Sequence, residues 1–178
     1  TCNACIPSRI NIKDFKFSKS NSRVMKANTD LRLKKNFGNN SAIHYELFKN
    51  YCFERHESSQ MMDMNMKEFN NFFFESQNKN QIFDLVDSSE NLLGAILVDI
   101  LNDGYSAVYS FFDPFKTKRS LGKLLILKLI NELKIINKPF LYLGYWIKNS
   151  QKMLYKANFN NIEFFFEGEW INKDVKKF

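Results

Sequence analysis

Three consecutive strand-like segments within residues 81–112 constrain the fold of this chain more than any other feature. They are QIFDLVD, LLGAILVDI and YSAVYSFF, and only a few residues separate each from the next. Connections this short join neighbouring antiparallel strands, and the Asp103-Gly104 pair favours a tight turn because it tolerates positive φ. The Asp113-Pro114 pair ends the third strand, since proline cannot donate a hydrogen bond to a sheet. The sequence therefore predicts an antiparallel meander.

A helix and further strands follow the meander. The segment RSLGKLLILKLINELKII is apolar around most of its circumference, which predicts a helix packed on a sheet. Next come a strand, FLYLGYWI, a helix, SQKMLYKANF, and a closing strand, IEFFFEGEW. This order of elements resembles the second half of the Gcn5-related N-acetyltransferase fold. We therefore expect an α+β fold whose central, mostly antiparallel sheet splays open near its middle.

The residues before the meander are predicted to hold two helices. SAIHYELFKNYCFERH can be capped by Ser41 and has apolar residues at i+4 spacing, and MKEFNNFFFES is the second candidate. The first forty residues are basic and irregular, with extended stretches. We divide the chain into residues 1–40, the tail of a cysteine-containing N-terminal region with a basic entry segment, and residues 41–178, an acyltransferase-like catalytic domain.

Composition narrows the class of protein. The chain has 178 residues and a formal charge of +7, which suits a polyanionic partner or simply a basic surface. No apolar run approaches the roughly 20 residues that span a bilayer. Three cysteines do not make a disulfide framework, and no signal-peptide core is visible, so we expect a cytoplasmic protein. Because the chain begins at Thr1, we also expect upstream residues.

The loop KTKRSLGK is a candidate anion site, because it joins a strand end to a helix start where backbone N–H groups are free. Acetyltransferases of this fold cradle a pyrophosphate there with Arg/Gln-x-x-Gly-x-Gly/Ala. Arg119 and Gly122 match, but Leu124 replaces the last small residue, which disfavours a standard coenzyme A cradle. Alternatively, Gly122 only lets the helix approach the sheet and Arg119 is solvated.

Two residues are candidates for proton transfer. The segment NSQKMLYKANF resembles the acetyltransferase pattern Asn-x-x-Ala-x-x-Leu-Tyr-x-x-x-Gly-Phe, with Asn158 in place of glycine. Its Tyr155 is predicted to act as a general acid, or else to be a buried tyrosine with one hydrogen-bond partner. Asp113 can accept a proton from an attacking amine or hold it as ammonium. An ordinary strand-ending turn is the alternative for Asp113.

Cys2 and Cys5 have the Cys-x-x-Cys spacing that binds a metal through two thiolates, although a structural site needs about four ligands. Cys52 falls on the apolar side of a helix and is expected in the core. His44 and His56 are too far apart in sequence for a two-histidine ligand pair. His56 can instead contribute to a polar site beside Arg55.

Seven stretches match one known family in the right order over nearly the whole chain. They are CNACIPSRI, FKFSKSNSRVMKANTDL, HYELFKNYCFERH, MDM, YSFFDP, RSLGKLLIL and FLYLGYWIKNSQKMLYKANF. Together they resemble the arginyl-tRNA–protein transferase family, in its bacterial aspartate/glutamate leucyltransferase branch. The resemblance implies transfer of leucine from Leu-tRNA to the N-terminal amine of proteins beginning with Asp or Glu, in the N-degron pathway.

Alternatives to this function remain open on sequence alone. The same scaffold can transfer arginine from Arg-tRNA, and the fold can host an acyl-CoA-dependent N-acetyltransferase. A non-enzymatic metal-clip module that binds nucleic acid is suggested by the cysteine pair and the basic charge. For the leading hypothesis, the expected partners are aminoacyl-tRNA and proteins with an acidic N-terminal residue. We expect no membrane partner and a monomeric protein. Transfer requires no cofactor, although family members bind an iron–sulfur cluster or zinc through upstream cysteines, with Cys2 and Cys5 as the tail of that region.

The resemblance also implies roles for individual residues. Asp113 and Tyr155 are the catalytic candidates. Arginine reads carboxylates well, so the acidic substrate residue is assigned to Arg9, Arg23 and Arg55, with His56 beside them. SKSNSR departs from the usual Ser-Arg-Ser-Gln-Arg-Arg at Ser22, so Arg23 acts alone or with Lys19. The tRNA end is assigned to Tyr145 and Trp146, which offer stacking faces worth about 1–3 kcal/mol per base, and to Lys152, Lys156, Arg119, Ser120 and Gly122 for phosphates.

Overall fold

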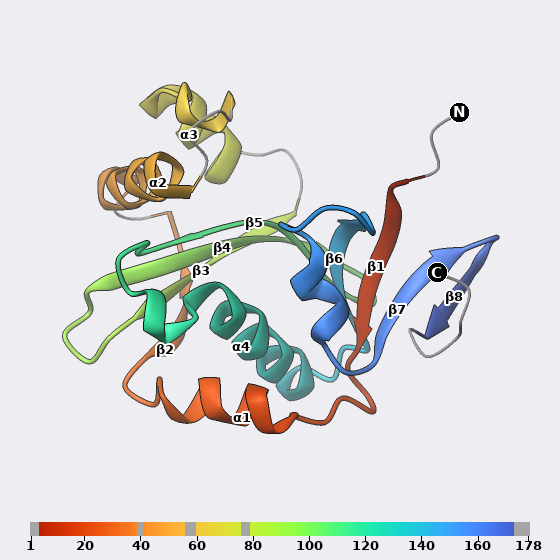
Figure 1. Ribbon diagram of the computed structural model, residues 1–178. Coiled ribbons are helices and arrows are strands. Elements are labelled where there is room, and N and C mark those ends of the chain that lie inside the picture. Colours follow the sequence, from red (N-terminus) through yellow and green to blue (C-terminus); the bar gives the residue numbers. More distant parts are fainter. Residues whose placement is uncertain (1–3, 39–40, 56–59, 76–78, 173–178) are drawn as a thin grey trace.

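The computed structural model describes residues 4–38, 41–55, 60–75 and 79–172, and is built on one eight-stranded sheet (Figure 1). The strand order is β2-β3-β4-β5-β6-β1-β7-β8. The strands are β1 (Ile6–Asn11), β2 (Arg32–Asn36), β3 (Asn80–Val86), β4 (Leu92–Leu101), β5 (Gly104–Phe112), β6 (Phe140–Trp146), β7 (Ile162–Phe166) and β8 (Glu169–Asn172). Every neighbouring pair is antiparallel except β5 and β6. The predicted α+β class with a mostly antiparallel sheet is confirmed.

Helices cover both faces of this sheet. They are α1 (Lys19–Lys26), α2 (Ser41–Arg55), α3 (Met66–Phe73) and α4 (Leu121–Ile135), with short 3-10 helices η1 (Gln60–Met62), η2 (Thr117–Arg119) and η3 (Leu154–Asn158). Figure 1 shows α1 and α4 on one face and α2 and α3 on the other. Each pair packs on its own hydrophobic cluster, and α4 alone buries eight apolar residues. No helix in the described ranges is both long enough and apolar enough to cross a bilayer.

The predicted meander β3-β4-β5 is confirmed, but the reason for its glycine is different. Asn102 and Asp103 form the turn, while Gly104 is the first residue of β5, paired with Leu101, and its φ is not positive. A Cβ at Gly104 would lie 1.8 Å from the carbonyl oxygen of Phe140. The glycine is therefore required by the close approach of β6, not by the turn.

The splay in the sheet lies between β5 and β6, near the middle of the strand order. The two strands pair only where residues 104–106 meet residues 140–142. Beyond that point β5 continues to Phe112 and β6 to Trp146 without pairing with each other. The opening between the strand ends is therefore bounded by β5, β6 and the start of α4 (Figure 1).

The first forty residues are more regular than the sequence suggested. They contribute β1, α1 and β2, and β1 lies inside the sheet between β6 and β7. Residues on both sides of position 40 therefore share one sheet, and the functional division at that position stays a prediction. Helix α1 was not expected because its sequence is almost wholly polar; Ser18 caps it by accepting a hydrogen bond from Asn21 N–H.

Two expected elements after α4 differ from the structure. SQKMLYKANF forms only turns and the short helix η3, instead of a full helix. IEFFFEGEW is a hairpin of β7 and β8 instead of one strand, because Glu167 and Gly168 adopt φ values of 50° and 87° and reverse the chain. The apolar pattern predicted extended chain over these residues but did not reveal the turn that separates β7 from β8.

Candidate functional site

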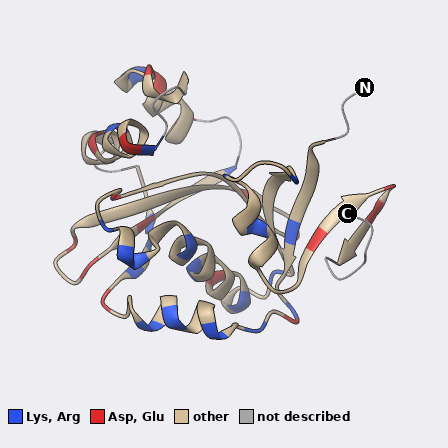
Figure 2. Ribbon diagram, in the orientation of Figure 1, with Lys and Arg blue, Asp and Glu red and all other residues tan. Residues whose placement is uncertain are grey.

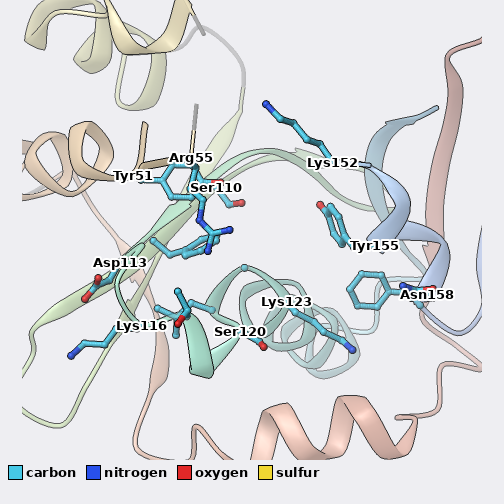
Figure 3. Close-up of a pocket in the computed structure, with 15 residues that line it drawn as sticks. Tyr51, Arg55, Ser110, Asp113, Lys116, Ser120, Lys123, Lys152, Tyr155 and Asn158 are labelled. Atoms are coloured by element: carbon cyan, nitrogen blue, oxygen red, sulfur yellow. The ribbon is translucent and has the colours of Figure 1, made fainter. Parts of the chain in front are cut away.

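A cavity of about 600 Å³ lies at the end of β5, between the end of α2, the start of α4 and η3 (Figure 3). Its lining comes from the end of α2, the end of β5, the loop before α4, the first turn of α4 and η3. The residues are Tyr51, Arg55, Ser110, Phe112, Asp113, Lys116, Thr117, Ser120, Leu121, Gly122, Lys123, Lys152, Tyr155, Asn158 and Phe159. The predicted site residues that the structure brings together here are Arg55, Asp113, Ser120, Gly122, Lys152 and Tyr155.

The cavity is strongly cationic. Of the residues that the structure describes, the cations Arg55, Lys116, Lys123 and Lys152 line it, and Asp113 is the one carboxylate among them. None of the four cations forms an ion pair with another residue in the described ranges. An anionic ligand is therefore favoured here, since a bound carboxylate or phosphate would meet unpaired positive charge.

Asp113 is used by the turn that ends β5. Its Oδ1 accepts a hydrogen bond from Phe115 N–H at 2.9 Å, and Figure 3 shows the carboxylate at the outer edge of the cavity, with Lys116. It points away from the space between Arg55 and Tyr155. The alternative of a strand-ending Asp-Pro turn accounts for this geometry, so the structure does not favour Asp113 as a base.

Tyr155 has the geometry of a proton donor. The residue is 46% exposed, and Figure 3 shows its hydroxyl directed into the cavity, across from the guanidinium of Arg55. Burial raises the pKa of Tyr155, because the charged phenolate loses solvation. The phenol is therefore protonated at neutral pH and can donate a hydrogen bond or a proton.

The start of α4 forms one wall of the cavity. Ser120, Leu121, Gly122 and Lys123 all line it, so the positive end of the helix dipole faces the space. A Cβ at Gly122 would lie 2.7 Å from Cε1 of Phe112, so glycine is needed for the helix to approach the sheet. Leu124 is fully buried in the core and does not line the cavity, so its side chain itself excludes no pyrophosphate.

Several residues predicted to bind tRNA are engaged elsewhere. Arg119 donates hydrogen bonds to Asn28 and Asp30 instead of facing the cavity. Trp146 is only 7% exposed and packs against Phe164, so the prediction that its ring stacks on a base is wrong. Tyr145 is exposed but does not line the cavity.

Lys156 is a structural residue at the end of β6. Its Nζ donates hydrogen bonds of 2.6 Å to the carbonyl oxygens of Leu143 and Tyr145. Burial lowers the pKa of Lys156, because the ammonium ion is taken out of water. The lysine therefore supports the irregular end of β6, where Gly144 has a φ of 70°, and does not reach a phosphate in the cavity.

Of the three arginines assigned to the acidic substrate residue, only Arg55 lines the cavity. Arg9 pairs with Glu163 at 2.7 Å, and its guanidinium lies 3.6 Å from the ring centre of Phe140 and 4.2 Å from that of Trp170. This contact ties β1, β6, β7 and β8 together, which corrects the prediction for Arg9. Arg23 is exposed on α1, outside the cavity. His56 lies outside the described residues.

The metal prediction stays untested. Cys2 lies outside the described residues, and Cys5 is exposed just before β1. Within the described ranges no three His, Cys, Asp or Glu side chains are grouped so that they could hold a metal ion. Cys52 is buried as expected, with its Sγ 3.9 Å from the Tyr109 hydroxyl.

Some cavity residues were not predicted. Tyr51 packs its ring against Phe112 at 4.8 Å, and burial raises its pKa while the nearby Arg55 charge opposes the rise. The spacing offers a signal, since Tyr51 precedes Arg55 by one helical turn and so shares its face. Lys123 is the last residue of the predicted anion loop KTKRSLGK, but no individual role was assigned to it. Ser110 gave no comparable signal, because alternation alone does not say which face of β5 meets a cavity.

Known proteins resemble this chain in sequence. A family model described as "Arginine-tRNA-protein transferase, C terminus" matches residues 43–166. The aspartate/glutamate leucyltransferase of Nitrosococcus oceani is 42% identical over 169 residues, covering 95% of this chain and 71% of the relative. The protein of the same name from Paramagnetospirillum magneticum is 40% identical, covering 95% of this chain and 69% of the relative.

Solved structures confirm the fold. FemX superposes with a TM-score of 0.63 at 9% identity, covering 83% of this chain and 54% of FemX. The ribosomal-protein-S18-alanine N-acetyltransferase of Escherichia coli superposes with a TM-score of 0.53 at 16% identity, covering 72% and 76% of the two chains. The sheet with its splay is thus that of the acetyltransferases, as predicted. By sequence, the chain belongs to the aspartate/glutamate leucyltransferases of the arginine-tRNA–protein transferase family.

Proposed function

We propose that this chain transfers leucine from Leu-tRNA to the N-terminal amine of proteins that begin with Asp or Glu. Membership of the family supports the reaction class. The new leucine at the N-terminus would mark the product as an N-degron. We further propose that the protein acts as a monomer in the cytoplasm, where aminoacyl-tRNA and newly exposed N-termini are both available.

The charge of the cavity is the observation that favours leucine over arginine as the donated residue. Among the described residues four cations line the cavity, and the one carboxylate, Asp113, caps a turn at the edge. An arginyl side chain would bring a fifth positive charge, and the one carboxylate among the described lining residues, Asp113, already accepts a hydrogen bond from the turn. A leucyl side chain instead finds the apolar surface of Phe112, Leu121 and Phe159.

The positive charge of the cavity also suits the acidic N-terminal residue of the substrate and the phosphates of the tRNA. An N-terminal Asp or Glu carries a carboxylate, which the Arg55 guanidinium can bind through two parallel hydrogen bonds. The terminal phosphates of the tRNA meet Lys123, Lys152 and the N-terminus of α4. Arg55 and Tyr155 face each other across the cavity, so the amine and the ester can meet between them (Figure 3).

The reaction needs positioning more than activation, because an aminoacyl ester is already activated. The α-amine attacks the ester carbonyl carbon; a C–N bond forms, and the bond from that carbon to the ribose oxygen breaks. Tyr155 donates its proton to the departing ribose oxygen. The attacking amine must be neutral, and since an α-amino group has a pKa of about 7.7–8.0, a sizeable fraction is already neutral near pH 7.5. Its nitrogen loses one further proton as the amide forms, and the return of a proton to the Tyr155 phenolate restores the phenol. This requires no strong base, consistent with Asp113 serving the turn.

A metal has no step in this scheme. The described residues offer one exposed thiol, that of Cys5, and complete no metal site around it. We propose that Cys2, Cys5 and upstream cysteines hold an iron–sulfur cluster or zinc. The transfer itself needs no cofactor.

The test offers Leu-tRNA, Arg-tRNA and acetyl-CoA in parallel to the complete polypeptide, with an Asp-initiated peptide as acceptor. Intact mass of the peptide identifies the added group, and a matched Asn-initiated peptide tests the need for the carboxylate. Leucine on the Asp-peptide alone is the expected result. An arginine or acetyl adduct, or equal use of the Asn-peptide, would refute the proposal.

A further inference from the structure

Helix α1 carries three cations on one face, which we call the α1 basic face: Lys19, Arg23 and Lys26. Their spacing of i, i+4 and i+7 places them together, and all three are exposed (Figure 2). The opposite face holds Asn21, which is fully buried. With about 1.5 Å of rise per residue, the three charges span about 10 Å along the helix.

These charges are not used within the described part of the protein. None of the three cations forms an ion pair there, and α1 has no acidic residue in its first turn. Asp30, which follows the helix, is bonded to Arg119. Together with Phe17 and Ser22, the three cations line a shallow hollow. The α1 basic face is thus a concave cationic surface with unpaired charge.

The structure fixes this face relative to the cavity. Lys123, which lines the cavity, donates a hydrogen bond of 3.1 Å to the Ser20 hydroxyl on α1. Asn28, 1% exposed, donates to the carbonyl oxygens of Val24 and Arg119, and Arg119 donates back to the Asn28 side chain. These hydrogen bonds therefore hold α1 and the residues that follow it against the first turn of α4 and the loop that leads into it.

The chemistry favours a phosphodiester chain over a lipid surface. A helix that binds in the plane of a membrane inserts its apolar face. The apolar residues of α1, Val24 and Met25, pack instead against the core under α4. Charged and polar side chains are left on the outside, and spaced cations beside a cavity suit a polyanion that continues out of it.

We propose that the α1 basic face binds phosphates of the tRNA acceptor stem while the terminal nucleotides occupy the cavity. This inference rests on the proposed function for the identity of the nucleic acid. It reassigns Arg23, and Lys19 with it, from the acidic substrate residue to the tRNA backbone. Lys123 then lies at the junction between the two parts of the bound tRNA.

The test variant is Lys19→Gln/Arg23→Gln/Lys26→Gln in the complete polypeptide. Its matched control is Lys13→Gln/Lys67→Gln/Lys79→Gln, which removes the same charge from exposed lysines that form no ion pair in the described ranges and lie outside α1 and the cavity. Two donors are compared: full-length Leu-tRNA and a leucylated 3′-terminal trinucleotide, which lacks the stem. Binding of uncharged tRNA is measured between 50 and 200 mM salt, concentrations chosen to resolve the roughly linear dependence of log K on log salt.

We expect the KM for Leu-tRNA to rise at least about tenfold, and the salt slope of tRNA binding to fall by about 2–3, roughly 0.7–0.9 for each lost phosphate contact. The KM for the Asp-peptide and the rate with the trinucleotide should stay unchanged. Equal losses in the control variant, or a parallel loss with the trinucleotide, would overturn the inference, because net charge or a damaged cavity would then explain the effect.

The two proposals fail separately. If the unaltered protein transfers no leucine but the α1 variant still weakens tRNA binding and its salt slope, the inference stands and the proposed function falls. If the unaltered protein transfers leucine but the α1 variant binds tRNA with unaltered affinity and salt slope, the proposed function stands and the inference falls. Loss of binding to anionic vesicles with an unchanged KM for Leu-tRNA would assign the face to a lipid surface and overturn the inference.

Discussion

Replacing Arg55 should remove the enzyme's preference for acidic N-termini while sparing the transfer chemistry. Arg55 is the one arginine lining the cavity among the described residues, and no ion pair with them holds it. Arg55→Gln keeps much of the side-chain length and removes the charge. We expect kcat/KM for an Asp-peptide to fall, whereas that for the otherwise identical Asn-peptide should barely change.

The size of the effect follows from the exposure of the arginine. A hydrogen bond to a charged group contributes about 1.5–3 kcal/mol, and the lower end applies because Arg55 is exposed to solvent. A loss of about 1.5 kcal/mol corresponds to about tenfold in kcat/KM. The assay is steady-state leucine transfer from saturating Leu-tRNA, with the ratio of the two peptides as the quantity compared.

A matched variant separates reading of the carboxylate from general electrostatics. Lys116→Gln removes the same charge from the outer edge of the same cavity, where Figure 3 shows its side chain turned away from Arg55 and Tyr155. It should leave the Asp/Asn ratio unchanged. If Arg55→Gln slows both peptides equally, the reasoning is refuted, and Arg55 serves tRNA binding or the fold instead.

Three further predictions follow from the contacts. Tyr155→Phe should lower kcat about 100-fold or more with little change in KM for either substrate. Because burial raises the pKa of Tyr155, rate profiles from pH 6 to 9 should show no loss attributable to ionisation of the phenol. Arg9→Met should cost about 3 kcal/mol in urea unfolding, since it strands Glu163, but leave the KM for the Asp-peptide unaltered; a raised KM with unchanged stability would contradict its structural role. Gly104→Ala should destabilise the protein by about 3 kcal/mol, because β6 must move away from the new Cβ, and unchanged stability would contradict that close approach.

Local patterns were enough to predict much of the sheet. The alternation through residues 81–112 and the apolar helix α4 both reflect which face of each element is buried, and that property is written in neighbouring residues. Helix α1 has only two apolar residues, Val24 and Met25, which is too few for an apolar stripe to be recognised in the sequence; a cap at Ser18 and contacts with α4 support it instead. The hairpin of β7 and β8 depends on two residues with positive φ, which no apolar spacing reveals.

The sequence by itself determined the family and the residue types of the site, since the matching stretches carry the arginines, the tyrosine and the anion loop together. Only the tertiary structure decided which of those residues meet. Arg9 and Arg55 are alike as side chains, yet Arg9 is held by Glu163, 154 positions away, and Arg55 lines the cavity. Trp146 is likewise covered by Phe164. A side chain's availability depends on partners that are distant in the chain and become neighbours only when the sheet forms.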